Sequence, residues 1–292
     1  MKLDVWVTLL VCTVSMLVSS ISASASTTTA TNNSSSTNVT AEKKPTPKTF
    51  GLALEISRSR SLIDFKDGSR SDGLDILIVP SVAAFNGKIS TQLAYSQNLR
   101  NQYSQTENDF ADLPVTYAFK ALPLAWADSM KTNFVYSITA VVPVSKYSRI
   151  KDELQTALSG RVGLSFTPAD GEGFSATAGL TLGRNFHTYE EDINGSVLNQ
   201  YSSNQSLGIE YSLSNWSVGV DFVNRSRLTY KGNTKSTFEL TEEIGYSVND
   251  NFSLALGHTN AGSTLKANGV DSNIELIDEN SSVVYGTIGF SY

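Results

Sequence analysis

The stretch QSLGIEYSLSNWSVGVDFV, residues 205–223, alternates apolar and polar side chains on both sides of one short break. Large apolar side chains occupy every second position in residues 207–213 and again in residues 216–222. Period two is the repeat of a β-strand, whose successive side chains point to opposite faces of the sheet. Ser214 and Asn215, between the two halves, are typical residues of a tight turn. The stretch therefore predicts a β-hairpin with one apolar and one polar face.

The same rhythm recurs from Thr49 to the C-terminus, where no stretch has convincing helical periodicity. We therefore predict an all-β fold of about twelve strands. They are expected near residues 49–62, 73–85, 88–101, 110–124, 132–145, 153–167, 174–187, 204–213, 216–230, 236–248, 252–261 and 281–292.

The connections alternate in length. Tight turns are expected at Asn86-Gly87, 169–173, Ser214-Asn215 and 249–251, and longer polar loops notably at 188–203 and 262–282. Only residues 124–130 blur the contrast. Short turns at one end and long loops at the other are typical of transmembrane antiparallel up-and-down β-barrels, which keep their short turns in the periplasm.

The two faces favour the same fold over a soluble one. In a soluble barrel of twelve strands the apolar phase would have to fill a wide core, and the small Gly, Ser and Thr phase would face water. Turned outward, the apolar phase forms a belt facing lipid around a polar lumen, and closure leaves no strand edge unpaired.

The chain ends on VVYGTIGFSY, residues 283–292, in which Ile288, Phe290 and Tyr292 share one phase. With this ending and this architecture, residues 49–292 resemble Gram-negative outer-membrane β-barrel proteins. The resemblance implies that Tyr292, Phe290 and Ile288 act as the signal read by the barrel-assembly machinery, with Gly286 a weak position. It also implies an outer-membrane location and contact with outer-membrane lipid and lipopolysaccharide.

The N-terminal region is expected to lie outside the fold. Residues 1–25 combine a positive start, an apolar stretch and a small-x-small site ending at Ala25, which predicts a secretory signal peptide. Residues 26–48 are rich in Ser and Thr and predict a disordered linker, with a plug or a partner-binding arm as the alternative. The only cysteine, Cys12, lies in the leader, and the net charge of −6 argues against a nucleic-acid partner.

The inward phase carries six acids and five bases, which predicts a weakly selective lumen. If Tyr230 pairs with Ser236, Arg227 falls opposite Glu239 and Arg225 lies diagonal to it. This cluster is predicted to be either a constriction lined for solutes or an ion-pair network that holds the barrel shut. The full set is Arg225, Arg227, Glu239, Glu243, Asp221, Glu210, Arg161, Arg100, Lys120, Glu55 and Asp75.

A second polar row is expected on the lipid-facing phase, where Gln205, Asn224, Glu242 and His258 fall side by side. Outer-membrane phospholipases place a Ser-His-Asn set on the outside of a twelve-stranded barrel. This row lacks the serine nucleophile that acyl transfer requires, so no enzyme is expected, and the row is better explained as the outer headgroup level.

The remaining polar side chains predict contacts at the rim. Arg58, Arg60 and Arg184 are expected at the outer rim, where they could meet lipopolysaccharide phosphates. His187 is expected to make a polar contact there, since no second His or Cys is available for a metal. Neither G-x-S-x-G nor a Gly-rich phosphate loop is present, so no cofactor is expected.

We therefore predict a narrow, weakly selective outer-membrane pore for small solutes or ions. One alternative is a non-conducting structural or surface-recognition barrel whose loops at 188–203 and 262–280 bind a partner. The other is an outer-membrane hydrolase that uses Asn224, Glu242 and His258.

Overall fold

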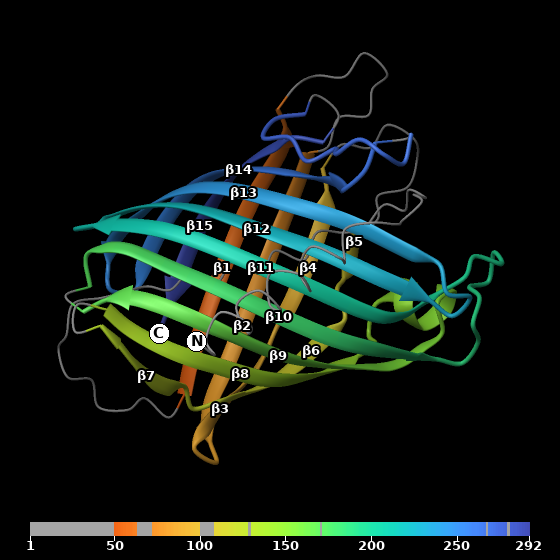
Figure 1. Cartoon of the computed structure of the whole chain (residues 1–292), viewed down its shortest axis with the longest axis horizontal. Coiled ribbons are helices and arrows are strands. Elements are labelled where there is room, and N and C mark those ends of the chain that lie inside the picture. The colour runs from red at the N-terminus through yellow and green to blue at the C-terminus, as the bar shows by residue number, and fades with distance from the viewer. Residues whose placement is uncertain are drawn as a thin grey trace, which may run out of the picture.

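The computed structural model describes residues 50–62, 72–99, 108–127, 130–169, 171–266, 268–278 and 281–292 (Figure 1). The predicted leader and linker lie outside the described residues, and so does Arg100. No helix in the described ranges is long and apolar enough to cross a membrane.

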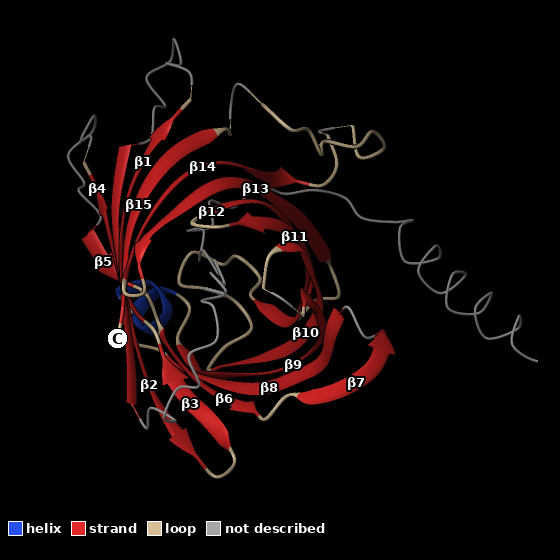
Figure 2. Cartoon of the chain, turned by 90° about the vertical axis from the view of Figure 1, so that its left-hand side faces the viewer, coloured by secondary structure: helices blue, strands red, loops and turns tan. Residues whose placement is uncertain are grey.

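The described strands form one antiparallel sheet that closes into a barrel of twelve strands, because β1 pairs with both β2 and β15. Figure 2 shows the strands surrounding a common interior, with β1 and β15 on one side and β10 and β11 across from them. Ten of the twelve are unbroken: β1 (Phe50–Ser61), β2 (Asp72–Ala84), β8 (Met130–Val142), β9 (Leu154–Pro168), β10 (Gly173–His187), β11 (Asn199–Leu213), β12 (Trp216–Thr229), β13 (Thr234–Asn249), β14 (Phe252–Ser263) and β15 (Val283–Ser291).

The third and fourth barrel strands are broken into pieces. The third consists of β3 (Gly87–Thr91) and β4 (Leu93–Asn98). The fourth, predicted at 110–124, consists of β5 (Asn108–Phe110), β6 (Leu113–Phe119) and β7 (Leu122–Ala127). Pro114 and Pro123 lie in β6 and β7, and a proline cannot donate to a ladder, so strands that contain it tend to be interrupted.

The last strand closes the barrel against the first, as predicted. Phe290 lies opposite Leu54 and Ile288 lies opposite Ile56. Beyond the end of β15, Tyr292 donates its N–H to the carbonyl of Leu52 at 2.8 Å and accepts the Leu52 N–H at 3.1 Å. The C-terminal residue is thus part of the seam of the barrel.

The apolar phase faces outward. Leu54, Ile56, Leu207, Val218 and Ile244 share it, and the last four have more than a third of their surface exposed. At the end with the short turns, outward aromatic rings contact each other across neighbouring strands: Phe119 and Tyr136 are stacked, and Phe174–Tyr211 and Trp216–Tyr246 are tilted pairs. An exposed apolar belt with an aromatic girdle is the outer surface of a membrane-spanning barrel.

The turns and loops are close to those predicted, with three corrections. The first turn consists of Phe85 and Asn86, both with positive φ, and therefore lies one residue before the predicted Asn86-Gly87. The loop predicted at 188–203 is shorter, because β11 begins at Asn199. The connection between β8 and β9 carries a short π-helix, η1 (Tyr147–Lys151), which the period-two pattern did not indicate.

Candidate functional site

The lumen wall is built from small polar side chains. Hydroxyls of neighbouring strands are hydrogen-bonded to each other in the pairs Ser57–Thr287 at 2.5 Å, Thr116–Thr139 at 2.8 Å and Thr241–Thr259 at 3.2 Å. Gly208 leaves room for Asp221, since a Cβ atom there would lie 2.4 Å from the Asp221 carboxylate. At this position, the absence of a side chain on Gly208 lets the Asp221 carboxylate lie close to the backbone of β11.

No apolar core fills this lumen. Among the described residues only two large apolar side chains are buried, Leu198 and Phe238. Leu198 lies in the connection between β10 and β11, and Phe238 has the outward phase of β13. In contrast, the lumen-facing side chains of Arg161 and Asp221 are exposed. A packed interior would bury both, so the structure leaves solvent-accessible space inside the barrel.

The structure brings two members of the predicted cluster on β12 and β13 together. Arg225 forms an ion pair with Glu239, with Nη1 2.7 Å from Oε2, although Glu239 lies opposite Val223 and is therefore diagonal to Arg225 on the other side from the one expected. The direct pairing of Arg227 with Glu239 is wrong, because Leu228 pairs with Thr234 and shifts the register by four residues. Arg227 lies opposite Lys235 instead.

Three acids gather around Gly219 in the half of the lumen nearer the short turns. Glu210 and Glu243 lie opposite Gly219 on its two neighbouring strands, and Asp221 follows two residues later. Ser212 donates to Glu210 and Tyr285 donates to Glu243, both at 2.8 Å. The bases Arg225, Arg227 and Lys235 occupy the other half, so charge is segregated along this wall.

The other predicted lumen residues are dispersed around the barrel. Glu55 pairs with Leu77, Asp75 with Ser96, and Arg161 with Thr181, all on the inward phase. Lys120 is exposed in the break between β6 and β7, so strand parity does not place it inside. The register adds three lumen-facing bases that sequence reasoning missed, although alternation could have found them: Lys88, Lys131 and Lys235.

The rim at the long-loop end is held by polar contacts around η1. Asp112 accepts the backbone N–H groups of Val144 and Ser145 at 3.0 Å, and the Ser148 hydroxyl also donates to it. Asp152 follows η1, and desolvation by burial raises the pKa of its carboxyl to about 6 even though Lys151 opposes the shift.

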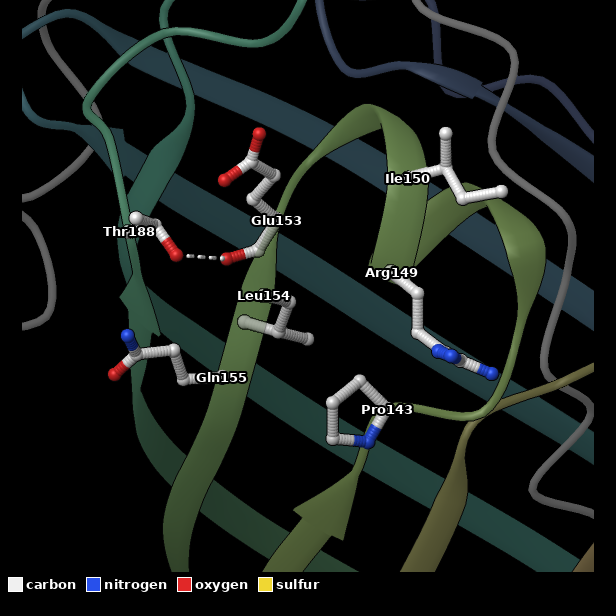
Figure 3. A pocket seen from close by; sticks show the side chains of 7 residues that line it. All are labelled: Pro143, Arg149, Ile150, Glu153, Leu154, Gln155 and Thr188. Carbon is white, nitrogen blue, oxygen red and sulfur yellow. Dashed lines mark hydrogen bonds between the residues drawn. The ribbon is translucent and has the colours of Figure 1, made fainter.

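The β10–β11 connection projects beyond the strand ends and meets the same rim (Figure 1). Asp192 in this connection accepts the N–H groups of Asn194 and Ser196, which lower the pKa of its carboxyl. An open hollow of about 500 Å³ lies between η1 and this connection. Figure 3 shows Arg149, Glu153 and Gln155 around it. The hollow is lined by both polar and apolar side chains and carries no cluster of charges of one sign.

The outward polar row is confirmed at two of its contacts. Glu242 lies opposite His258, with Oε2 3.6 Å from Nδ1, and Asn224 donates to Gln205 at 2.7 Å. The predicted neighbours Asn224 and Glu242 are not opposite each other, because Asn224 faces Phe238. Nε2 of His258 is buried without a hydrogen-bond partner among the described residues.

The connection between β14 and β15 covers part of the outer face, which the sequence did not indicate. Asn260 has no exposed surface, donates to the Glu275 carbonyl at 2.6 Å and accepts from the Ser281 hydroxyl at 2.6 Å. Asn273 donates to the Ser263 carbonyl at 3.1 Å and lies close to Gly262, which pairs with the buried Phe238. This connection therefore lies against β13 and β14 from outside.

His187 and the three arginines lie at the long-loop end, as expected. Nδ1 of His187 is 3.3 Å from the hydroxyl of Tyr230. Arg58 forms a double hydrogen bond with Asp72, at 2.9 and 3.0 Å, and Arg60 is exposed. Arg184 lies over aromatic rings. Within the described ranges, no three His, Cys, Asp or Glu side chains are grouped so as to hold a metal ion.

These features define a porin-like barrel: twelve antiparallel strands with an apolar outer belt, an aromatic girdle and a polar interior. The fold is shared with an outer-membrane channel from Pseudomonas putida F1, at 8% identity and a TM-score of 0.52, over 83% of this chain and 95% of that one. The NanC porin aligns at 12% identity and a TM-score of 0.47, over 82% of this chain and 98% of its own. The KdgM porin aligns at 7% identity and a TM-score of 0.44, over 82% of this chain and 99% of its own. The sequence matches no protein-family model and no curated protein.

Proposed function

We propose that this barrel is a narrow pore for small solutes or ions in the outer membrane of a Gram-negative cell, reached through an N-terminal signal peptide. The observation that carries the proposal is the lumen. Its charged side chains Arg161 and Asp221 are exposed, and the described residues place no buried apolar side chain inside it. Barrels of about eight strands are filled by side chains and those of sixteen or more hold a channel, so twelve strands suit a narrow opening.

Weak selectivity is part of the proposal. Around the ring, the lumen-facing acids at positions 55, 75, 210, 221, 239 and 243 are nearly matched by bases on the same phase. Strong selectivity requires an excess of one sign at the constriction. The segregation of acids and bases along β12 and β13 creates a field along the axis, but it adds little net charge.

The test is conductance of the purified chain in planar bilayers. We expect discrete steps and a small preference between cations and anions. Neutralising the acidic group with the double variant Asp221→Asn, Glu243→Gln should shift the preference toward anions. Asp250→Asn, in the exposed turn after β13, is the matched control and should leave selectivity unchanged.

Two results would contradict parts of this proposal. A folded barrel without conductance at any voltage removes the proposal altogether. Strong selectivity for one sign, unaltered by the double variant, shows that the acidic group does not line the path of the ions.

A surface-recognition barrel is the second candidate, because the rim connections are ordered by ion pairs. Lys231 contacts Glu191, and Lys266 lies 3.0 Å from Glu275. Connections held in one shape are suited to binding a partner. If this second candidate is right, shortening residues 264–282 should abolish binding of the partner, and neither the unaltered nor the shortened chain should conduct. A pore would conduct with the full-length connection and with the shortened one.

A further inference from the structure

The pair of Glu242 and His258 lies nearer the short turns than the outward polar row was expected to lie. Asn224 is eight residues from Trp216 of the aromatic girdle, whereas Glu242 is four residues from Tyr246, which lies opposite Trp216. With a rise of about 2.5 Å per residue along the barrel axis in a tilted strand, Glu242 lies about 10 Å from the girdle. The apolar band of such barrels is about 25 Å tall, so the pair lies near its middle.

The surroundings of this pair are apolar and supply no hydrogen bond to it. Val220 lies opposite Glu242 on β12, and Ile244 and Leu256, the next outward residues toward the girdle, are exposed. Oε2 of Glu242 is 3.6 Å from Nδ1 of His258, which is too far for a hydrogen bond, and the Glu242 side chain is 34% exposed. Lipid tails offer neither donors nor acceptors, so ionisable side chains at this depth are expected to contact another protein surface.

The connection between β14 and β15 adds apolar surface beside the pair, on the side of the long loops. Asn260, two residues beyond His258 on the outward phase, donates to the Glu275 carbonyl and so fixes the connection at this height. Ile274 and Leu276 flank Glu275 and are both exposed. The pair therefore has exposed aliphatic side chains on both sides of it along the barrel. Polar groups that bond across an otherwise apolar contact are a common means by which membrane-spanning segments associate.

A second copy of this chain carries the groups that the pair lacks. Copies inserted into one membrane point the same way, so a symmetric pair of them has its two-fold axis along the membrane normal, and every residue keeps its height. Glu242 and His258 lie opposite each other on neighbouring strands, at nearly the same height. An axis that passes between β13 and β14 therefore brings the carboxylate of each copy to the imidazole of the other.

We propose that two copies of this chain associate through the outer faces of β13 and β14, with the Glu242 carboxylate of each copy accepting a hydrogen bond from His258 of the partner subunit. Ile244 and Leu256 pack around the two polar contacts and exclude lipid from them. This surface lies outside the barrel and each barrel keeps its own lumen, so a failed conductance test leaves the proposal standing.

The first test is sedimentation equilibrium of the folded chain in density-matched detergent micelles, which measures the dissociation constant of a dimer. We expect the unaltered chain to form a dimer. Glu242→Leu and His258→Leu should each weaken it about a hundredfold, because one charge-assisted hydrogen bond commonly supplies about tenfold and each dimer contains two. Gln205→Leu, which removes an exposed outward polar side chain two strands from β13, is the matched control and should leave the dissociation constant unchanged.

Exchanging the charges distinguishes a contact between copies from a role within one barrel. Glu242→His leaves two imidazoles on each copy and His258→Glu leaves two carboxylates, so neither variant should dimerise alone. Mixed in equal amounts, the two variants should form a heterodimer, in which a tagged chain of one retains an untagged chain of the other. If both variants are folded and their mixture stays monomeric, the proposal is overturned.

Cross-linking in lipid vesicles leaves the pair intact and serves if the charge variants do not fold. Leu256→Cys, in a chain that also carries Cys12→Ser, should be joined to a second copy by a short bismaleimide. Val162→Cys, at an exposed outward position of β9, should not be joined. The proposal is overturned if the unaltered chain is monomeric at every ratio of lipid to protein, if it forms trimers, or if both cysteine variants cross-link equally.

Discussion

Replacing Arg225 by methionine should destabilise the barrel more than replacing any other lumen arginine in the described residues. Its Nη1 lies 2.7 Å from Glu239, whose side chain is only 8% exposed. Methionine keeps the volume but leaves the carboxylate buried without a counter-ion. Breaking a buried ion pair costs about 3–5 kcal/mol, and since Arg225 itself is 20% exposed we expect about 3 kcal/mol.

The assay is urea unfolding of the refolded barrel in lipid vesicles, followed by tryptophan fluorescence. Arg161→Met is the control, because Arg161 is exposed and has no ion pair among the described residues. It should change the free energy of unfolding by less than about 0.5 kcal/mol. The double variant Arg225→Met, Glu239→Leu removes both charges and should recover most of the loss. If Arg225→Met costs no more than Arg161→Met, the pair contributes nothing and the reasoning is wrong.

Three other substitutions test separate parts of the barrel. Burial raises the pKa of Asp152 from 3.8 to about 6, so the folded state binds the extra proton and stability falls as pH rises through that window. Asp152→Asn should remove this dependence and stabilise the rim at pH 7 by about 1 kcal/mol, after allowance for its partial exposure; a pH profile that keeps its slope would contradict this. Asn260→Leu should release residues 264–282 from the outer face, which limited proteolysis would detect as faster cleavage there. Tyr292→Ser should lower assembly in cells far more than refolding of the purified chain, and an equal loss in both would mean that the residue only closes the seam.

The faces and the closure of the barrel could be predicted because both follow from alternation alone. Strand parity is unaffected by where a strand begins, so residues such as Glu210 and Asp221 were placed inside without knowing any register. The final strand was recognised by its unbroken alternation up to Tyr292. The interruption of the fourth strand was not predicted, although Pro114 and Pro123 cannot donate to a ladder and could have indicated it.

Register could not be predicted where a loop decides it. The pairing of Arg227 with Glu239 assumed that β12 and β13 are joined by five residues after Tyr230. In the structure Gly232 takes a positive φ, Thr229 accepts its N–H at 3.0 Å, and the strands pair again from Thr234. A shift of four keeps every side chain on its face and changes only its partner. That is why the charged residues of β12 and β13 stay on the lumen face while the predicted Arg227–Glu239 pair does not form.

On the outer face near the long loops, polar side chains at the same height on the barrel are accommodated in two different ways. On β13 and β14 the protein covers one of them itself, since Asn260 is completely buried and its amide is satisfied by Glu275 and Ser281 of the β14–β15 connection. On β10 to β12 no described connection lies over Gln205 or Arg184, and both are exposed. Amides can satisfy one another within the sheet, as Gln205 and Asn224 do, but a guanidinium cannot. Arg184 is instead accommodated on the outer face by the rings of Phe186 and Tyr201, over which its guanidinium lies.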